Sequence, residues 1–189
     1  MKKILSILLV VMSCTAVFSS DDELSKQATA FYSDNNRVKT MDLLLQIDDA
    51  SRSAQDWILL GNVFADNGEP DNSVYMYQKA INKDKKAYKA YYNLGNYYYE
   101  KGQPILAGDY YKKALRYKKD NPYIYYNLAC VQIRQNNPKG ARASLNKAIS
   151  LKSDVPEFHY NLAYVYKKLD NEKMAQVYLE NYNSLMENQ

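Results

Sequence analysis

The side chains that most often carry chemistry in proteins are scarce in this sequence. It contains one histidine, His159, and two cysteines, Cys14 and Cys130, in 189 residues. A protein metal site gathers three or four His, Cys or carboxylate ligands, and nucleophilic catalysis usually pairs a Cys or Ser with a base. The sequence also has no phosphate-binding glycine loop and no nucleophile elbow. We therefore expect a protein that is not an enzyme and that binds no metal and no cofactor.

Tyrosine is the residue type that stands out instead. The chain has 20 Tyr against 4 Phe and 1 Trp, so its aromatic residues are mostly rings that carry a hydroxyl group. With 47% hydrophobic and 24% charged residues, the composition excludes a disordered or collagen-like chain. The elements described next must bury part of these rings and leave the rest to water or to a ligand.

The first twenty residues have the pattern of a secretory signal peptide. Lys2 and Lys3 precede an apolar stretch over residues 4–18, and acidic residues begin at Asp21. The apolar stretch is shorter than the roughly 20 residues that a membrane-spanning helix needs. We therefore expect an exported protein, periplasmic or associated with the cell envelope, whose residues 1–20 are removed.

Two modes of cleavage remain open. Val17 and Ser19 stand three and one residues before a cut after Ser19, as ordinary signal peptidase requires. Alternatively, residues 11–14 resemble a bacterial lipobox, in which Cys14 would be lipidated and become the new amino terminus. Met12 is bulky for a lipobox, and the segment stays apolar after Cys14. The mature protein would work outside the cytoplasm in either case.

A repeat of 34 residues dominates the rest of the chain. Its landmarks are four leucines, followed by small residues and prolines in the same phase: Leu60, Leu94, Leu128 and Leu162; Ser73, Ala107, Ala141 and Ala175; Pro70, Pro104 and Pro138. A period held at so many positions indicates a solenoid of stacked units, because one unit cannot bury its apolar face alone.

Each unit is predicted to be a pair of antiparallel helices. In residues 88–121 apolar residues recur every three or four positions before and after a break at Gly102 and Pro104. Gly102 can adopt the left-handed conformation that ends the first helix, and Pro104 suits the first turn of the second. Gly95 and Ala107 are small enough to let the two helices approach closely. His159 occupies the position that holds Trp57 or a tyrosine in other units, which favours packing over catalysis.

This pattern resembles the tetratricopeptide repeat family, whose 34-residue unit carries an aromatic residue, Leu-Gly, Tyr, Ala, a second aromatic residue and Ala. The resemblance covers residues 54–87, 88–121, 122–155 and 156–189. It departs from the family pattern at Ala129 and Ala163, which replace the glycine, and at Tyr182, which replaces the last alanine. The resemblance implies an all-α, right-handed superhelical solenoid of antiparallel helix pairs.

Both ends of the expected solenoid are atypical. Residues 21–53 are interpreted as a degenerate helix pair or cap, with a turn at residues 35–36 and a phase that is off by one residue. At the other end the last helix is expected to run from about residue 171 to Met186, so that Leu185 and Met186 cover the final repeat. Self-association through this end is a further possibility.

The resemblance also implies where a ligand would bind. In this family the first helix of each unit lines a concave groove, and the matching positions here are rich in Tyr and Asn. Tyr rings offer stiff contact area, and Asn amides can bond the backbone of an extended peptide. The expected partner-binding residues are Tyr92, Asn93, Asn96, Tyr99, Tyr123, Tyr126, Asn127, Tyr160, Asn161 and Tyr164. The hypothesis depends most on three groove positions, Tyr92, Tyr126 and Tyr160. Four other tyrosines fall at core positions: Tyr91, Tyr98, Tyr111 and Tyr125. Cys130 also falls in the groove, as a small apolar residue or a reactive thiol.

Charge adds little to this picture. Residues 88–121 and 122–155 each have a net charge of +4, counting 7 basic against 3 acidic and 5 against 1, and most basic residues fall on second helices or linkers. A solvated face explains such a run, with anionic polymers or an acidic end of another copy as alternatives. After residue 20 the net charge is +2, from 23 basic and 21 acidic residues, which argues against nucleic acid as a partner.

The sequence thus predicts a non-catalytic protein-interaction scaffold or adaptor in a bacterial cell envelope, with a protein or peptide partner held in a Tyr and Asn groove. One alternative is a lipid-anchored assembly factor for outer-membrane or pilus components, in which the anchor is the only contact with the membrane. Another is a self-associating structural protein, a homo-oligomer.

Overall fold

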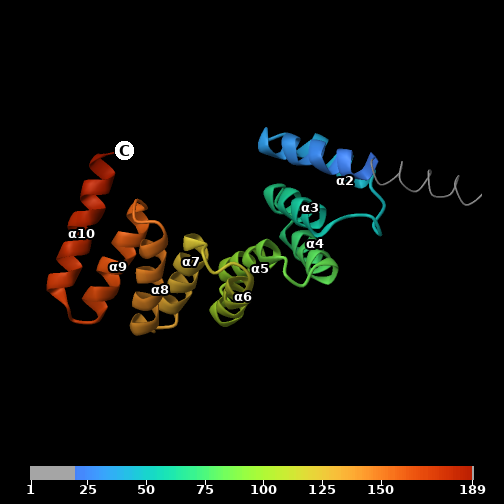
Figure 1. Ribbon diagram of the computed structural model, residues 1–189. Coiled ribbons are helices and arrows are strands. Elements are labelled where there is room, and N and C mark those ends of the chain that lie inside the picture. The colour runs from blue at the N-terminus through green and yellow to red at the C-terminus, as the bar shows by residue number, and fades with distance from the viewer. Residues whose placement is uncertain (1–19, 189) are drawn as a thin grey trace, which may run out of the picture. The chain divides into compact units, whose positions relative to one another are not determined.

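The computed structural model describes residues 20–188, and these residues form α-helices joined by short turns (Figure 1). Residues 20–33 are helical, and the helices that follow are α2 (Arg37–Leu45), α3 (Ala54–Asp66), α4 (Pro70–Lys83), α5 (Tyr88–Glu100), α6 (Pro104–Tyr117), α7 (Pro122–Arg134), α8 (Pro138–Leu151), α9 (Pro156–Lys168) and α10 (Glu172–Glu187). The all-α helix-pair fold expected from the sequence is confirmed. In the described part of the chain, no helix has the length and apolar character to cross a membrane. Residues 1–19 of the expected signal peptide, Cys14 included, lie outside the described residues.

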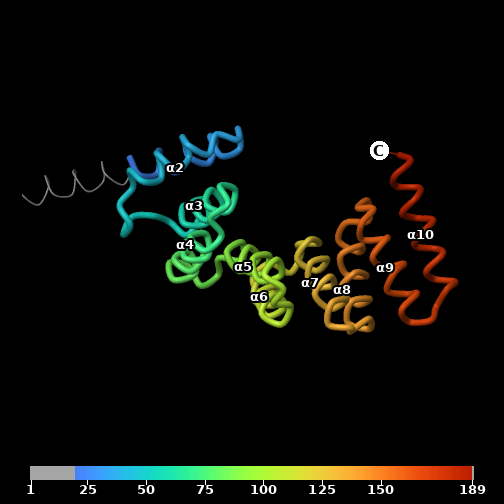
Figure 2. The backbone as a smooth tube through the Cα atoms, turned by 180° about the vertical axis from the view of Figure 1, so that it is seen from behind, coloured from blue at the N-terminus to red at the C-terminus, as the bar shows by residue number. Residues whose placement is uncertain are grey.

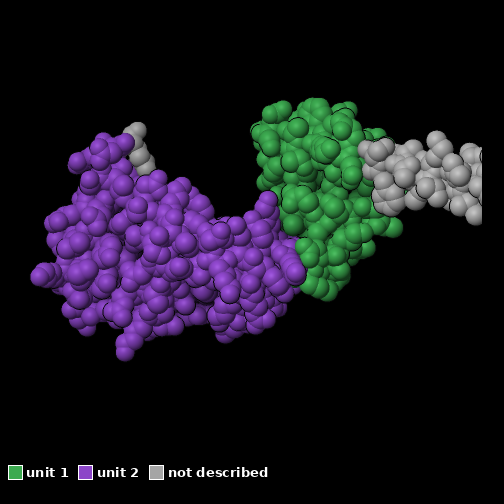
Figure 3. All heavy atoms as spheres, viewed as in Figure 1, with its two compact units in different colours: residues 1–85 green, residues 86–189 purple. Residues whose placement is uncertain are grey.

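The chain divides into two compact units (Figure 3). Unit 1 ends at Lys85 and contains the first helix, α2, α3 and α4, whereas unit 2 begins at Lys86 and contains α5 to α10. In unit 2 the helices form three antiparallel pairs that follow one another along the chain (Figure 2). Each unit is a stack of helix pairs of the kind that the repeat implies.

The turn inside each pair has the same hydrogen bonds every time. Gly68 and Gly102 have positive φ, as do Asn35, Asn136 and Asp170 at the matching places. The residue after each of them donates its backbone N–H to a carbonyl five residues earlier, at 2.8 to 3.0 Å. This bond satisfies a carbonyl at the end of the first helix, so a residue that tolerates the left-handed conformation is needed there. The turn at Asn35 joins the helix over residues 20–33 to α2 with the same hydrogen bond as in the later pairs.

The second helices begin where the sequence predicts. Proline occupies the first turn of α4, α6 and α8. Asn137 and Asn171 cap α8 and α10 by accepting the N–H groups of Gly140 and Met174. Because helix starts are marked by proline and by side-chain caps, the sequence locates them well.

The core of unit 2 runs between successive pairs. One buried cluster contains Ala107 and Tyr111 of α6 with Ile124, Leu128 and Val131 of α7. The next contains Ala129, Ala141 and Leu145 of one pair with Leu162 and Val165 of α9. Apolar side chains of one pair are therefore covered by the first helix of the next pair, as a solenoid requires.

The close approach expected at Gly95 and Ala107 is present, because Ala107 is fully buried and a Cβ atom added at Gly95 would lie 2.5 Å from Cε1 of Tyr111 on the second helix. At the end of the chain Leu185 is half-buried, as expected, but Met186 is 48% exposed and does not cover the last repeat. Tyr182 packs there instead, with its ring 5.3 Å from that of Tyr160.

Candidate functional site

The expected groove residues in unit 2 come from the first helices of its pairs, α5, α7 and α9. The 34-residue period places Tyr92, Tyr126 and Tyr160 at the same register of these three helices. Tyr99, Asn127 and Tyr164 lie on the same helices, at other positions of the expected groove. We call the surface formed by these side chains the inner face of unit 2.

A polar network joins the first two pairs across the inner face. The Tyr111 hydroxyl donates to Asn96 Oδ1 at 2.8 Å. Asn127 Nδ2 donates to the same oxygen at 3.0 Å and to Tyr92 Oη at 3.1 Å. The amide N–H groups of Asn127 therefore bond within the protein, where the sequence suggested that they would bond a peptide backbone. Because buried polar groups without partners are costly, this network fixes one pair against the next.

A pocket of about 330 Å³ opens beside this network. Its lining comes from α5, α6 and α7 and consists of Asn96, Tyr99, Glu100, Tyr111, Tyr126, Asn127 and Cys130. Three of these seven residues are tyrosines, and the others provide two amide groups, one carboxylate and one thiol. Such a mixture of apolar walls and a few polar groups is typical of sites that take one large side chain of a ligand.

Burial changes the acid–base properties of two groups in this pocket. It raises the pKa of Tyr126 to about 12, with a further contribution from nearby Cys130. It also raises the pKa of the Cys130 thiol, whose sulfur accepts a hydrogen bond from Asn161 Nδ2 at 3.6 Å. Both groups are therefore neutral at physiological pH, so the pocket provides no thiolate nucleophile.

The expected groove tyrosines differ in what surrounds them. Tyr92 is half-buried and its ring lies 5.9 Å from that of Tyr111, and Tyr126 stacks on Phe158 with ring centres 5.0 Å apart. The Tyr92 ring therefore packs against the second helix of its own pair, whereas the Tyr126 ring packs against the first helix of the next pair. Tyr160 is 53% exposed. Tyr123 and Tyr164 are also exposed, and Tyr123 Oη lies 3.1 Å from Lys152 Nζ.

Two pocket residues were not expected from the sequence. Tyr111 was assigned to the core, and it is buried, but its hydroxyl reaches the polar network and its side chain lines the pocket. Glu100 ends α5 and was not considered as a site residue. The spacing that assigned Tyr111 to the core is correct, but spacing does not report how far a tyrosine hydroxyl extends.

The remaining candidates for chemistry have structural roles. His159 is buried, its Nε2 lies 2.8 Å from the Ser153 carbonyl oxygen, and its ring faces that of Tyr178. Asn93 is half-buried on α5. Within residues 20–188 no three His, Cys, Asp or Glu side chains gather as a metal site would require.

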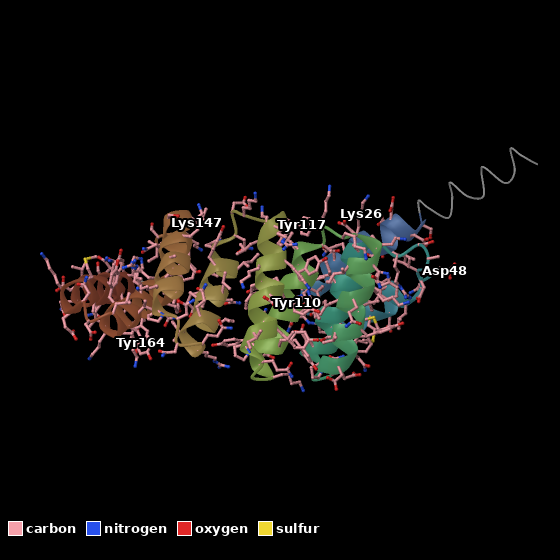
Figure 4. The ribbon with its side chains drawn as sticks, turned by 90° about the horizontal axis from the view of Figure 1, so that it is seen from below. Lys26, Asp48, Tyr110, Tyr117, Lys147 and Tyr164 are labelled. Carbon is pink, nitrogen blue, oxygen red and sulfur yellow. The ribbon has the colours of Figure 1, made fainter. Side chains whose placement is uncertain are left out.

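Basic residues lie on both sides of unit 2. Lys147 of α8 and Tyr164 of α9 project on opposite sides of the ribbon in Figure 4, whereas Lys167 lies beside Tyr160 and Tyr164. Near the pocket, the guanidinium of Arg134 stacks on the Tyr99 ring at 3.8 Å from the ring centre. This arrangement holds the Tyr99 ring in place at the edge of the pocket.

Family models for this type of repeat match the chain. The model described as TPR repeat matches residues 61–102 and 133–170, and the model described as tetratricopeptide repeat matches residues 88–121 and 156–185. The chain belongs to the tetratricopeptide repeat family, whose members are generally non-catalytic scaffolds for protein interactions.

Solved structures with the same fold include two of MamA and one of pilF from Pseudomonas aeruginosa. MamA AMB-1 is 16% identical with a TM-score of 0.72, over 88% of this chain and 98% of that one. A second MamA structure is 18% identical with a TM-score of 0.75, over 85% and 95%. The pilF structure is 20% identical with a TM-score of 0.77, over 89% and 78%. At these identities the likeness establishes the fold alone. No curated protein matches the chain significantly.

Proposed function

We propose that the protein is a scaffold of the bacterial cell envelope that holds a segment of a partner protein against the inner face of unit 2. The observation that carries this proposal is the aromatic pocket beside Tyr99, Tyr126 and Cys130. The pocket opens on the inner face rather than being filled by the next helix pair. Its residues also come from three helices, so its shape depends on the folded stack.

The pocket suits a peptide or helix that presents one large side chain. A volume of about 330 Å³ exceeds that of a single Phe or Leu side chain, and the Tyr rings give contact area at little entropic cost. Glu100 is the exposed carboxylate at the rim. It favours a partner with a hydrogen-bond donor or a positive charge near its anchoring side chain. The exposed ring of Tyr164 would then contact a more distant part of the same segment.

Export is part of the proposal and rests on the sequence of residues 1–20. A basic start, a short apolar stretch and small residues before Asp21 are the features that support it. The partner would then be a periplasmic, membrane or cell-wall protein. Fractionation of cells that produce the full chain tests this part, with the mass of the mature protein fixing the cleavage site.

Lipid anchoring is the second candidate, and Cys14 is the observation that favours it. In that form the scaffold would serve the assembly of envelope components from the membrane surface. Metabolic labelling with palmitate, with Cys14→Ser as the control, distinguishes the two forms. Label that disappears in the variant supports the anchor, whereas a mature amino terminus beyond residue 14 refutes it.

The groove itself is tested by capture of the partner from envelope extract. Tyr99→Ala removes one wall of the pocket, and Tyr117→Ala, an exposed tyrosine of α6 outside the pocket, is the matched control. We expect capture to fall about tenfold or more with Tyr99→Ala, because a buried aromatic contact is worth one to a few kcal/mol. Equal capture by both variants, with unchanged melting temperatures, would refute the groove.

A further inference from the structure

The last helix pair leaves a second hollow at the end of unit 2. In Figure 1, α10 is the outermost helix of this unit, beside α9. A pocket of about 290 Å³ lies between them, and its lining residues are Tyr160, Ala163, Tyr164 and Lys167 of α9 with Glu172, Ala175, Gln176 and Leu179 of α10. We call this surface the end seat. It shares no lining residue with the pocket of the proposed groove, although Tyr160 and Tyr164 belong to the inner face.

The same surface one repeat earlier holds a helix. Ala129, Ala141 and Leu145 lie 34 residues before Ala163, Ala175 and Leu179, and they are covered by Leu162 and Val165 of α9. Leu145 is fully buried there, whereas Leu179 is 36% exposed. The end seat is therefore built to receive a helix with branched apolar residues at positions i and i+3.

Tyr182 shortens this seat. Earlier repeats have Ala80, Ala114 and Ala148 at its position, all fully buried. Tyr182 packs its ring on Tyr160, as Phe158 packs on Tyr126 one repeat earlier. It therefore occupies the place of the first turn of an incoming helix. The seat that remains accommodates roughly two turns, so it favours a short helix over a full repeat.

The chain itself carries a short helix with the required pattern. Helix α2 has nine residues, and it buries Thr40, Leu43 and Leu44 on one side. On the other side Val38 is 75% exposed and Leu45 is 58% exposed, with the half-buried Met41 between them. The stripe Val38, Met41 and Leu45 has spacings of three and four residues, which matches the spacing of Leu162 and Val165.

The two surfaces also carry charges of opposite sign. Asp42 is exposed beside the α2 stripe, and Lys167 is exposed at the rim of the end seat, where the preceding repeat has Ile133. An incoming α2 would bring the Asp42 carboxylate near the Lys167 ammonium group. We propose that α2 of one copy docks in the end seat of a second copy, so that copies associate head to tail. Such a contact leaves a free α2 and a free end seat on every complex, and short linear oligomers follow.

Light scattering against concentration tests this inference on residues 21–189, the part of the chain that follows the expected signal peptide. We expect the average mass to rise above that of the monomer as concentration increases. Val38→Asp disables the docking helix and Leu179→Asp disables the seat, and each should weaken self-association about 10- to 100-fold. Ile105→Asp is the matched control, because Ile105 is 71% exposed on α6 and belongs to neither surface. Unchanged far-UV circular dichroism would show that the variants fold.

Mixing the two disabled variants is the decisive step. Each keeps one intact surface, so the mixture should form a 1:1 dimer and nothing larger, although each variant alone is monomeric. Asp42→Lys and Lys167→Glu should each weaken association about two- to fivefold, and their combination in one chain should restore it. A wild-type chain that stays monomeric would overturn the inference. So would a Leu179→Asp effect without a Val38→Asp effect, which would mean that the seat takes a different occupant.

Discussion

Glycine packs against tyrosine inside a helix pair, and this packing leads to a prediction about stability. The effect of Gly95→Ala should change from destabilising to stabilising when Tyr111 is replaced by Leu. A Cβ atom at Gly95 would lie 2.5 and 2.6 Å from two carbons of the Tyr111 ring. Gly61 meets Tyr77 in the same way. The next two repeats instead combine Ala129 with Leu145 and Ala163 with Leu179. The chain thus uses either Gly with Tyr or Ala with Leu.

The magnitude follows from two opposing effects. Overpacking a core lowers the free energy of unfolding by about 1–3 kcal/mol. Replacing Gly by Ala inside a helix raises it by about 1 kcal/mol. The Tyr111 ring is buried and cannot move aside easily. Gly95→Ala should therefore destabilise the protein by about 1 kcal/mol. In a Tyr111→Leu background, where the ring is gone, the same change should stabilise it by about 1 kcal/mol. The coupling energy between the two sites is then about 2 kcal/mol.

Urea unfolding followed by circular dichroism measures all four chains of this cycle. Tyr111→Leu alone should be destabilising, because it leaves a cavity and removes the hydrogen bond to Asn96. Gly61→Ala with Tyr77→Leu provides a parallel cycle in unit 1, where the single tryptophan, Trp57, reports unfolding by fluorescence. If Gly95→Ala has the same effect in the wild-type chain and in the Tyr111→Leu background, the close approach of helix and ring is not what selects glycine.

Three further predictions concern the inner face. Asn127→Ala should lower stability by about 1–3 kcal/mol in urea unfolding, because Asn96 and Tyr92 each lose a partner; a loss no larger than experimental error would contradict a structural network. The Cys130 thiol should react with maleimide more slowly than a free thiol at pH 7 and approach its rate as pH rises, because burial raises its pKa; labelling that is fast and independent of pH would contradict this. Tyr126 should make the protein less stable at alkaline pH. The unfolded chain ionises this tyrosine near pH 10 and the folded chain near 12, so its contribution is complete below pH 10 and is lost towards pH 12. Tyr126→Phe should therefore reduce the fall of the melting temperature over this range, and an unchanged fall would refute the assignment.

Much of the fold could be predicted from the local sequence. The turns at Gly102 and Asn136 need residues that tolerate positive φ, and Pro104 and Pro138 mark helix starts, so each pair could be placed from the sequence. The division of the chain after Lys85 could not. The 34-residue period continues through that point. The period shows which positions are equivalent from one repeat to the next, and it does not show where the chain divides into compact units.

The candidate site was predicted less completely than the fold. The helices and faces of Tyr99, Tyr126 and Asn127 follow from helical spacing. Whether an amide bonds a ligand or a neighbouring helix depends on distances between pairs, which spacing along the chain does not give. For this reason the hydrogen bonds from Asn127 and the contribution of Tyr111 to the pocket emerged only in three dimensions.

The measurement that tests the scaffold proposal most directly is photocrosslinking in living cells. A photoreactive phenylalanine derivative at Glu100 stands at the rim of the groove pocket, and the same group at Lys147 stands on the side of unit 2 away from Tyr164. The proposal predicts a discrete adduct with one envelope protein from position 100 and none from position 147. Adducts of the same kind from both positions, or from neither, would contradict it.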